Sequence, residues 1–189
     1  ERVVEQRTNE LQIKNRELEI ETSLEKVRAV AMGMHKPDDM LEVCKTMYHE
    51  LKSLGFDELR NAMIHSFPED NVFFINYDYS PSTKGLIAQI PCKGNASIEK
   101  FVKAIRKSAN AFHHLVVKGK ELKDWIAFRK ANKEPNDPRL NKIDSLHYYN
   151  YSVGNSGIGI STYNPISKEK QDLLQRFRNV FQLAYQRYT

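Results

Sequence analysis

The first 34 residues constrain the fold more than any other segment, because they contain no proline and only one glycine, Gly33. They are rich in glutamate, arginine, glutamine and leucine, which favour a long helix. At about 1.5 Å per residue, such a helix would reach roughly 50 Å, which exceeds what a domain of this size needs. We therefore divide the chain into a helix over residues 1–34 and a domain over residues 35–189.

A heptad spacing of apolar residues indicates a partner for the first half of this helix. Val4, Leu11 and Leu18 recur every seven residues, while the complementary seam positions are polar. Polar seam residues set the register and oligomeric state of a coiled coil but lower its stability. We predict a homodimer through this helix, with Val4, Leu11, Asn15 and Leu18 in its seam. The alternative is a helix that lies on its own domain, and the apolar series after Ile20, which has another phase, fits such packing.

The rest of the chain alternates helical and extended segments. Hydrophobic periodicity predicts helices over residues 38–54, 97–110, 119–131 and from Ser167, as N-cap, to the chain end. Turn residues separate predicted strands over residues 59–67, 72–80, 86–90, 113–117, 147–153 and 157–163. Residues 132–141 contain two prolines and are predicted to form an exposed loop. Strands that arrive as hairpins, with helices at both chain ends, indicate an α+β fold with a largely antiparallel sheet flanked by helices.

Positive charge gathers in one stretch of the chain. Residues 93–133 contain eleven lysines and arginines against three acidic residues, whereas the whole chain has a net charge of +5. A basic surface can meet phosphate or an acidic partner. Since no nucleic-acid-binding motif accompanies the charge, we interpret it as solvated surface and expect no nucleic acid partner.

The sequence also bears on where the protein works. No apolar run approaches the ~20 residues of a membrane helix, so we expect no membrane insertion. The two cysteines, Cys44 and Cys92, form no disulfide framework or zinc motif, which favours a reducing, cytoplasmic location. The chain begins at Glu1 without a signal-peptide pattern, so we expect a fragment of a longer protein.

None of the familiar catalytic motifs occurs in the sequence. The six histidines are scattered, no nucleophile stands in a recognisable context, and Gly157 and Gly159 lack the pattern of a phosphate-binding loop. We therefore predict no metal, no cofactor and no catalytic residue. Aromatic residues in two strands instead indicate a ligand cavity, although the same side chains could be ordinary core. The predicted ligand-binding residues are Tyr77, Tyr79, Lys84, Trp125, Arg129, Tyr149 and Tyr151.

Both ends of the chain resemble connectors of bacterial signalling proteins. Residues 5–11 (EQRTNEL) and 15–19 (NRELE) resemble linker helices that precede output modules in sensor histidine kinases. Residues 24–34 (LEKVRAVAMGM) resemble the segment that opens GAF-like sensor domains in multidomain signalling proteins, particularly of Bacteroidetes type. Residues 175–188 resemble the closing helix of the same family. The matched segments cover about a third of the chain.

The resemblance implies a GAF-like, cytoplasmic, dimeric sensory or relay module of a two-component system, upstream of a kinase or cyclase. It carries over no catalytic residue, because His35 is followed by Lys36-Pro37 rather than by the acidic residue of a phosphoacceptor motif. We therefore expect a non-enzymatic module that relays the signal of an unidentified small molecule or partner through dimeric helices. The alternatives are a ligand-free dimerisation or spacer module, an unrecognised enzyme, and nucleic acid binding through residues 93–133.

Overall fold

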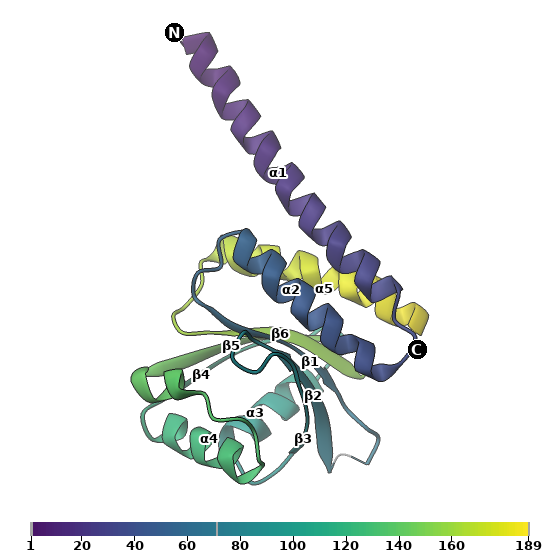
Figure 1. Ribbon diagram of the computed structural model, residues 1–189, viewed down its shortest axis with the longest axis vertical. Helices are drawn as coiled ribbons and strands as arrows, with labels where there is room; N and C mark the ends of the chain where they lie inside the picture. Colours follow the sequence, from purple (N-terminus) through teal and green to yellow (C-terminus); the bar gives the residue numbers. More distant parts are fainter. Residues whose placement is uncertain (1, 71, 189) are drawn as a thin grey trace.

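The computed structural model describes residues 2–70 and 72–188 and shows one six-stranded sheet between two layers of helices (Figure 1). The helices are α1 (Arg2–Met32), α2 (Met40–Ser53), α3 (Ala96–Ile105), α4 (Gly119–Ala131) and α5 (Lys168–Tyr188). The strands are β1 (Leu59–Ser66), β2 (Phe73–Tyr79), β3 (Leu86–Pro91), β4 (Phe112–Lys118), β5 (Ser145–Val153) and β6 (Ser156–Thr162). Their order is β3-β2-β1-β6-β5-β4, and each neighbouring pair is antiparallel. The predicted α+β class, flanking helices and long N-terminal helix are confirmed.

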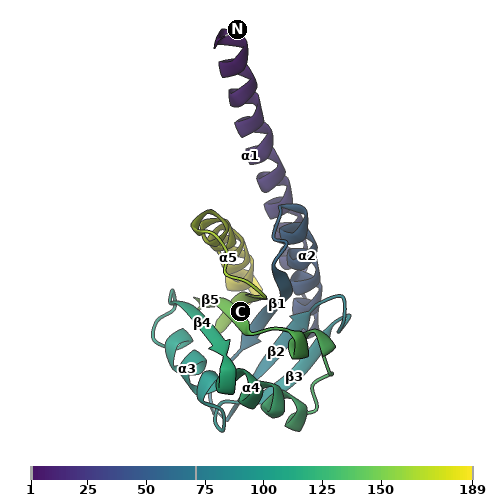
Figure 2. The ribbon, with the colours of Figure 1, turned by 90° about the vertical axis from the view of Figure 1, so that its left-hand side faces the viewer.

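The two faces of the sheet bury two separate sets of side chains. Along β1, Ala62 and Ile64 belong to the core beneath α1, α2 and α5, whereas Met63 packs in the core beneath α3 and α4. Successive side chains of a strand point to opposite faces, so the alternation in the sequence assigns each residue to one core. Figure 2 shows α3 and α4 on the side of the sheet opposite to α2 and α5.

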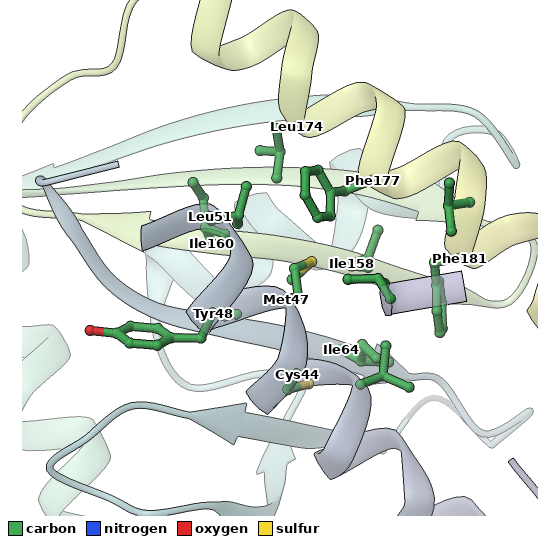
Figure 3. Packing of buried hydrophobic residues seen from close by; sticks show 14 of the residues in the cluster. Cys44, Met47, Tyr48, Leu51, Ile64, Ile158, Ile160, Leu174, Phe177 and Phe181 are labelled. Carbon is green, nitrogen blue, oxygen red and sulfur yellow. The ribbon is translucent and has the colours of Figure 1, made fainter. Parts of the chain in front are cut away.

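The core beneath α2 and α5 is apolar and closely packed (Figure 3). Met47 and Leu51 of α2 and Phe177 and Phe181 of α5 are fully buried against strands β1 and β6. Cys44 also lies in this core, where its thiol donates a hydrogen bond to the backbone oxygen of Tyr77 over 3.4 Å. Burial raises the pKa of the Cys44 thiol well above its usual range, so the thiol stays protonated and unreactive near neutral pH.

Helix α1 is packed at its end and free at its beginning. Leu24, Val27 and Ala31 are buried against the domain, and Arg176 of α5 forms ion pairs with Glu17 and Glu21. The predicted seam residues Val4, Leu11, Asn15 and Leu18 are all exposed. Figures 1 and 2 show the first half of α1 extending past the domain. In residues 2–70 and 72–188, no helix has the length and apolar character that crossing a bilayer requires.

Two predicted segments differ from the structure. The helix predicted over residues 97–110 already ends at Ile105. The segment predicted as an exposed loop, residues 132–141, is partly buried, because Leu140 fills the core beneath α3 and α4 and Asp137 pairs with Arg60. A 3-10 helix over Pro138–Lys142 forms there, and the Asp137 side chain caps it by accepting a hydrogen bond from the backbone nitrogen of Arg139.

Candidate functional site

A cavity of about 50 Å³ lies between the sheet and the helices α3 and α4. Its apolar lining includes Met63 and Phe74 from the sheet, Phe101 from α3 and Trp125 from α4. Its polar lining comes mostly from the strands and includes residues separated by up to 90 positions in the sequence, such as Arg60 and Asn150. The antiparallel pairing of β2, β1, β6 and β5 brings these residues onto one surface.

Four buried polar atoms at this cavity have no hydrogen-bond partner among the described residues. They are Nδ1 of His65, Oδ1 of Asn76, Oδ1 of Asp78 and Oδ1 of Asn150. Each of the four residues is at most 7% exposed. Folded proteins satisfy nearly all buried polar groups, because an unpaired one costs about 1–3 kcal/mol. Four such atoms around one cavity therefore indicate that the site is built to hold something polar.

The second oxygen of Asp78 is held firmly in place. Asn61 donates a hydrogen bond from Nδ2 to Oδ2 of Asp78 over 2.6 Å, and its own Oδ1 accepts one from the backbone nitrogen of Ser161 over 3.1 Å. Burial raises the pKa of Asp78 to about 6, although Arg60 and Arg129 act in the opposite direction. With a pKa of about 6, the Asp78 carboxyl is mostly ionised at neutral pH and then accepts hydrogen bonds from a fixed position.

The two arginines of the cavity wall already have partners. Arg60 forms an ion pair with Asp137 over 3.2 Å, and Arg129 forms one with Glu134 over 2.7 Å. All four side chains are at most 6% exposed, so each charge is buried with its counter-charge. Asp78 is consequently the one carboxylate of this wall without an ion-pair partner among the described residues.

Glycine in β6 makes room for Asn150 on the cavity floor. A Cβ at Gly159 would lie 2.1 Å from Oδ1 of Asn150 and 2.5 Å from the backbone oxygen of Tyr149. Gly159 and Asn150 are direct cross-strand partners, so the Asn150 side chain lies over the bare backbone of β6. The glycine spacing in residues 157–159 therefore shapes the floor of the cavity, which the sequence alone does not reveal.

His65 is held neutral among aromatic rings. Its ring centroid lies 4.9 Å from that of Phe101 and 5.5 Å from that of Phe74. Burial lowers the pKa of His65 to about 3, so the ring carries no charge near neutral pH. A neutral imidazole has one donor and one acceptor nitrogen, so the free Nδ1 can either accept or donate.

The structure places two of the seven predicted ligand residues at this cavity. Trp125 and Arg129 line it, and Nε1 of Trp125 donates a hydrogen bond to the hydroxyl of Tyr148 over 2.9 Å. The other five lie elsewhere. Tyr77, Tyr149 and Tyr151 are buried in the core beneath α2 and α5, Tyr79 contacts Tyr48 and His49 of α2, and Lys84 is exposed in the β2–β3 turn. Their role as ligand residues stays a prediction.

Sequence reasoning missed the polar floor of the site. The missed residues are Asn61, His65, Asn76, Asp78 and Asn150. A signal was present, since Asn61 and His65 lie four residues apart in β1, and Asn76 and Asp78 lie two apart in β2. Polar residues at even spacing within mainly apolar strands share one face, and their neighbours at odd spacing are core.

Neither a search for metal-binding side chains nor the comparisons with known proteins assigns a function to the cavity. Among residues 2–70 and 72–188, no group of three or more His, Cys, Asp or Glu side chains is placed to hold a metal ion. No family model matches the sequence. No curated protein matches it either. The resemblance to GAF-like domains therefore stays a prediction.

Proposed function

We propose that this chain is a non-catalytic sensory module of a signal-transduction protein, which binds a small molecule between the sheet and α3/α4 and relays that state through dimeric helices. The observation that carries the proposal is the set of unpartnered atoms of His65, Asn76, Asp78 and Asn150 around one cavity. A buried apolar cavity with a few convergent polar groups is the usual form of a small-molecule site. A GAF-like identity, a cytoplasmic location and an origin in a bacterial sensor histidine kinase belong to the same proposal.

A chain of contacts leads from the cavity to α1. The last residue of α3, Ile105, accepts a hydrogen bond on its backbone oxygen from the hydroxyl of Ser152 in β5. Arg178 of α5 binds the backbone oxygen of Ser152 and also that of Ala109, in the loop that follows α3. Two residues earlier on α5, Arg176 pairs with α1. A movement of α3 upon binding would therefore act on α5 and, through it, on α1.

The exposed half of α1 supplies the output in this proposal. Its seam residues have no packing role within the domain, because Val4, Leu11 and Leu18 are 60–68% exposed. Pairing of two such helices would bury the seam, and a shift in their relative rotation would transmit the signal to a neighbouring domain.

The alternative of a ligand-free spacer module predicts a filled core, which the cavity and its unpartnered atoms do not favour. An enzyme is a second alternative, and one observation favours it: the pKa values of Asp78 and His65 are strongly shifted at the same cavity, as occurs in active sites. Burial is the largest cause of both shifts, so they also follow from a binding site.

The proposal is tested by a ligand screen that has two readouts. Small polar metabolites are screened by native mass spectrometry and thermal unfolding, with Asn76→Val as the variant that removes one unpartnered oxygen. Spin labels on the exposed position 13 report the distance between the two α1 helices. We expect a ligand that stabilises the parent chain but not Asn76→Val, and that changes the interhelix distance.

Three outcomes would contradict the proposal. Binding without a change in the interhelix distance would leave a binding protein without a relay. A monomeric full chain would remove the dimeric output. Turnover of a bound compound, followed by mass spectrometry and lost in Asp78→Asn, would establish the enzyme alternative.

A further inference from the structure

We propose that the ligand of this cavity is a small, uncharged molecule that presents several N–H or O–H donors to the sheet. The inference rests on the proposed function, and it specifies the chemical class of ligand that the site takes. It follows from three properties of the cavity: which atoms are left without partners, how its charges are balanced, and how much space it offers.

The unpartnered atoms are predominantly acceptors. Oδ1 of Asp78 accepts hydrogen bonds whenever the carboxyl is ionised, and its position is fixed because Asn61 holds the other oxygen. Asn76 and Asn150 also present Oδ1 to the cavity. An amide can turn to offer its NH₂ instead, but an ionised carboxylate can only accept. Asp78 therefore determines whether the ligand donates or accepts at this position. The ligand must therefore donate.

The arrangement of these acceptors along the sheet requires more than one donor. Asn76 and Asp78 lie two residues apart on β2, which places them roughly 7 Å apart along the strand. His65 is the direct cross-strand partner of Asn76. A ligand over this part of the sheet can reach the carboxylate with one end and the amide or the imidazole with the other. One donor would leave the remaining acceptors buried without partners.

The charges of the wall leave no room for a further net charge. Arg60 and Arg129 are positive, Glu134 and Asp78 are negative, and Asp137 behind Arg60 is also bound by Arg139. An uncharged ligand preserves this balance. An anion would meet the Asp78 carboxylate and the acceptor oxygens, and a cation would be repelled by Arg60 and Arg129, whose positive charges already act on Asp78. Burying an unpaired charge is strongly unfavourable.

The size of the cavity limits the ligand to a few heavy atoms. Its volume of about 50 Å³ is roughly a third of the 150 Å³ of an apolar cavity that takes up benzene. Phe101 of α3 lines the cavity together with Phe74, so a larger molecule would have to displace α3. That requirement connects the ligand class with the relay, since a ligand with a larger apolar body would displace α3 more.

Four planar molecules of the same shape separate donor capacity from charge. Urea is an uncharged donor, guanidinium is a cationic donor, acetone is an uncharged acceptor, and nitrate is an anionic acceptor. Each is titrated into the full chain to about 100 mM, well below the molar range in which urea or guanidinium unfolds small proteins. Binding is followed by NMR, from the side-chain amide signals of Asn76 and Asn150 and the ring signals of His65.

We expect urea to shift these signals with an apparent affinity at least about tenfold above those of guanidinium, acetone and nitrate. Urea is the one probe of the four that both donates hydrogen bonds and carries no charge. Asp78→Asn should lower the affinity for urea about tenfold, since the charged acceptor is lost. The matched control is Asp124→Asn on the exposed side of α4, which should leave the affinity unchanged.

The possible failures are distinguishable. Preferred binding of acetone, nitrate or guanidinium at the same signals would overturn the donor class but keep the cavity as a ligand site. If none of the four probes shifts these signals, this inference is overturned, whereas the proposed function is overturned only if the metabolite screen also finds no ligand. Binding of urea that Asp78→Asn leaves unchanged would place the contact elsewhere and would also overturn the inference.

Discussion

Arg178 of α5 donates hydrogen bonds from Nε and Nη2 to the backbone oxygen of Ser152 at the end of β5, over 3.1 and 2.9 Å. The same guanidinium reaches Asn110 and the backbone oxygen of Ala109. Arg178 is only 8% exposed, so these bonds are shielded from water. The end of β5, the loop after α3 and helix α5, which packs against α1, thus share one side chain.

Replacing Arg178 should be far more damaging than replacing Arg176, two residues earlier on the same helix. We expect Arg178→Met to lower the free energy of unfolding by about 3 kcal/mol, because it leaves buried oxygens without donors. Arg176→Met removes ion pairs that are 35–53% exposed and should cost less than about 1 kcal/mol. Urea denaturation of both variants measures the difference. Equal losses of stability would show that the buried hydrogen bonds of Arg178 contribute no more than the exposed ion pairs of Arg176.

Gly159 should be the glycine of β6 that cannot be replaced. In Gly159→Ala the new methyl group meets the backbone oxygen of Tyr149, which cannot turn away, so we expect a loss of about 1–3 kcal/mol or more. Gly157→Ala is the matched control, since its nearest neighbour would lie 3.5 Å away. We expect that variant to stay within about 1 kcal/mol of the parent chain. Thermal unfolding would contradict this account if both variants lost the same stability.

The buried groups Asp78 and His65 should give stability opposite dependences on pH. The pKa of Asp78 is raised by burial from 3.8 to about 6, so stability present below pH 3.8 is lost as the pH rises through 6. The pKa of His65 is lowered by burial from 6.5 to about 3, so stability present above pH 6.5 is lost as the pH falls toward 3. The two slopes oppose each other between pH 4 and 6.

Single substitutions should separate these slopes. Relative to the parent chain, Asp78→Asn should gain stability as the pH rises from 4 to 7, by on the order of 3 kcal/mol. His65→Gln should show the reverse trend over the same range. Urea denaturation at each pH gives both curves. Parallel curves for the parent chain and Asp78→Asn would mean that the pKa of this carboxyl is not raised. The charges of Arg60 and Arg129, which lower this pKa, would then outweigh burial and the charge of Glu134, which raise it.

The proposed seam of α1 can be tested without removing any of the domain's core. We expect Leu11→Glu to convert a dimer to a monomer, because it places a charge in the seam. Ile13→Glu is the matched control, since Ile13 is 71% exposed and lies about 200° around the helix from Leu11. Light scattering gives the masses. A parent chain that is already monomeric, or equal effects of the two variants, would exclude the seam.

The fold could be predicted because its signals are local. The absence of proline marks α1, the turn residues between paired strands mark the hairpins, and the residue range predicted for α4 is the one observed. Ser167 was predicted as the N-cap of the last helix, and its hydroxyl accepts a hydrogen bond from the backbone nitrogen of Lys170. Each of these depends on residues within a few positions of one another.

The even spacing of polar residues within β1 and β2 could be seen in the sequence, but which strands together form the cavity could not, because that depends on residues far apart in the chain. Arg60 meets Asp137 across 77 positions, and this pairing is what buries a segment that reads as a loop. Asn150 reaches the cavity only because β5 lies beside β6 and Gly159 leaves space there. Three of the predicted aromatic residues, Tyr77, Tyr149 and Tyr151, lie in the core on the other side of the sheet. The face that each of them occupies depends on strand register and sheet order, which the sequence does not give.

Helix α1 is one uninterrupted rod that contacts the domain from about Arg16, which donates a hydrogen bond to the backbone oxygen of Leu54, to Ala31. The roughly 14 residues before these contacts span about 20 Å without any loop to absorb a displacement. A rigid helix rotates as a whole. If its contacts with the domain shift by one residue, the far end therefore rotates by about 100° about the helix axis. In the proposed relay, a repacking of α1 beside α5 would therefore change the azimuth of its first turn.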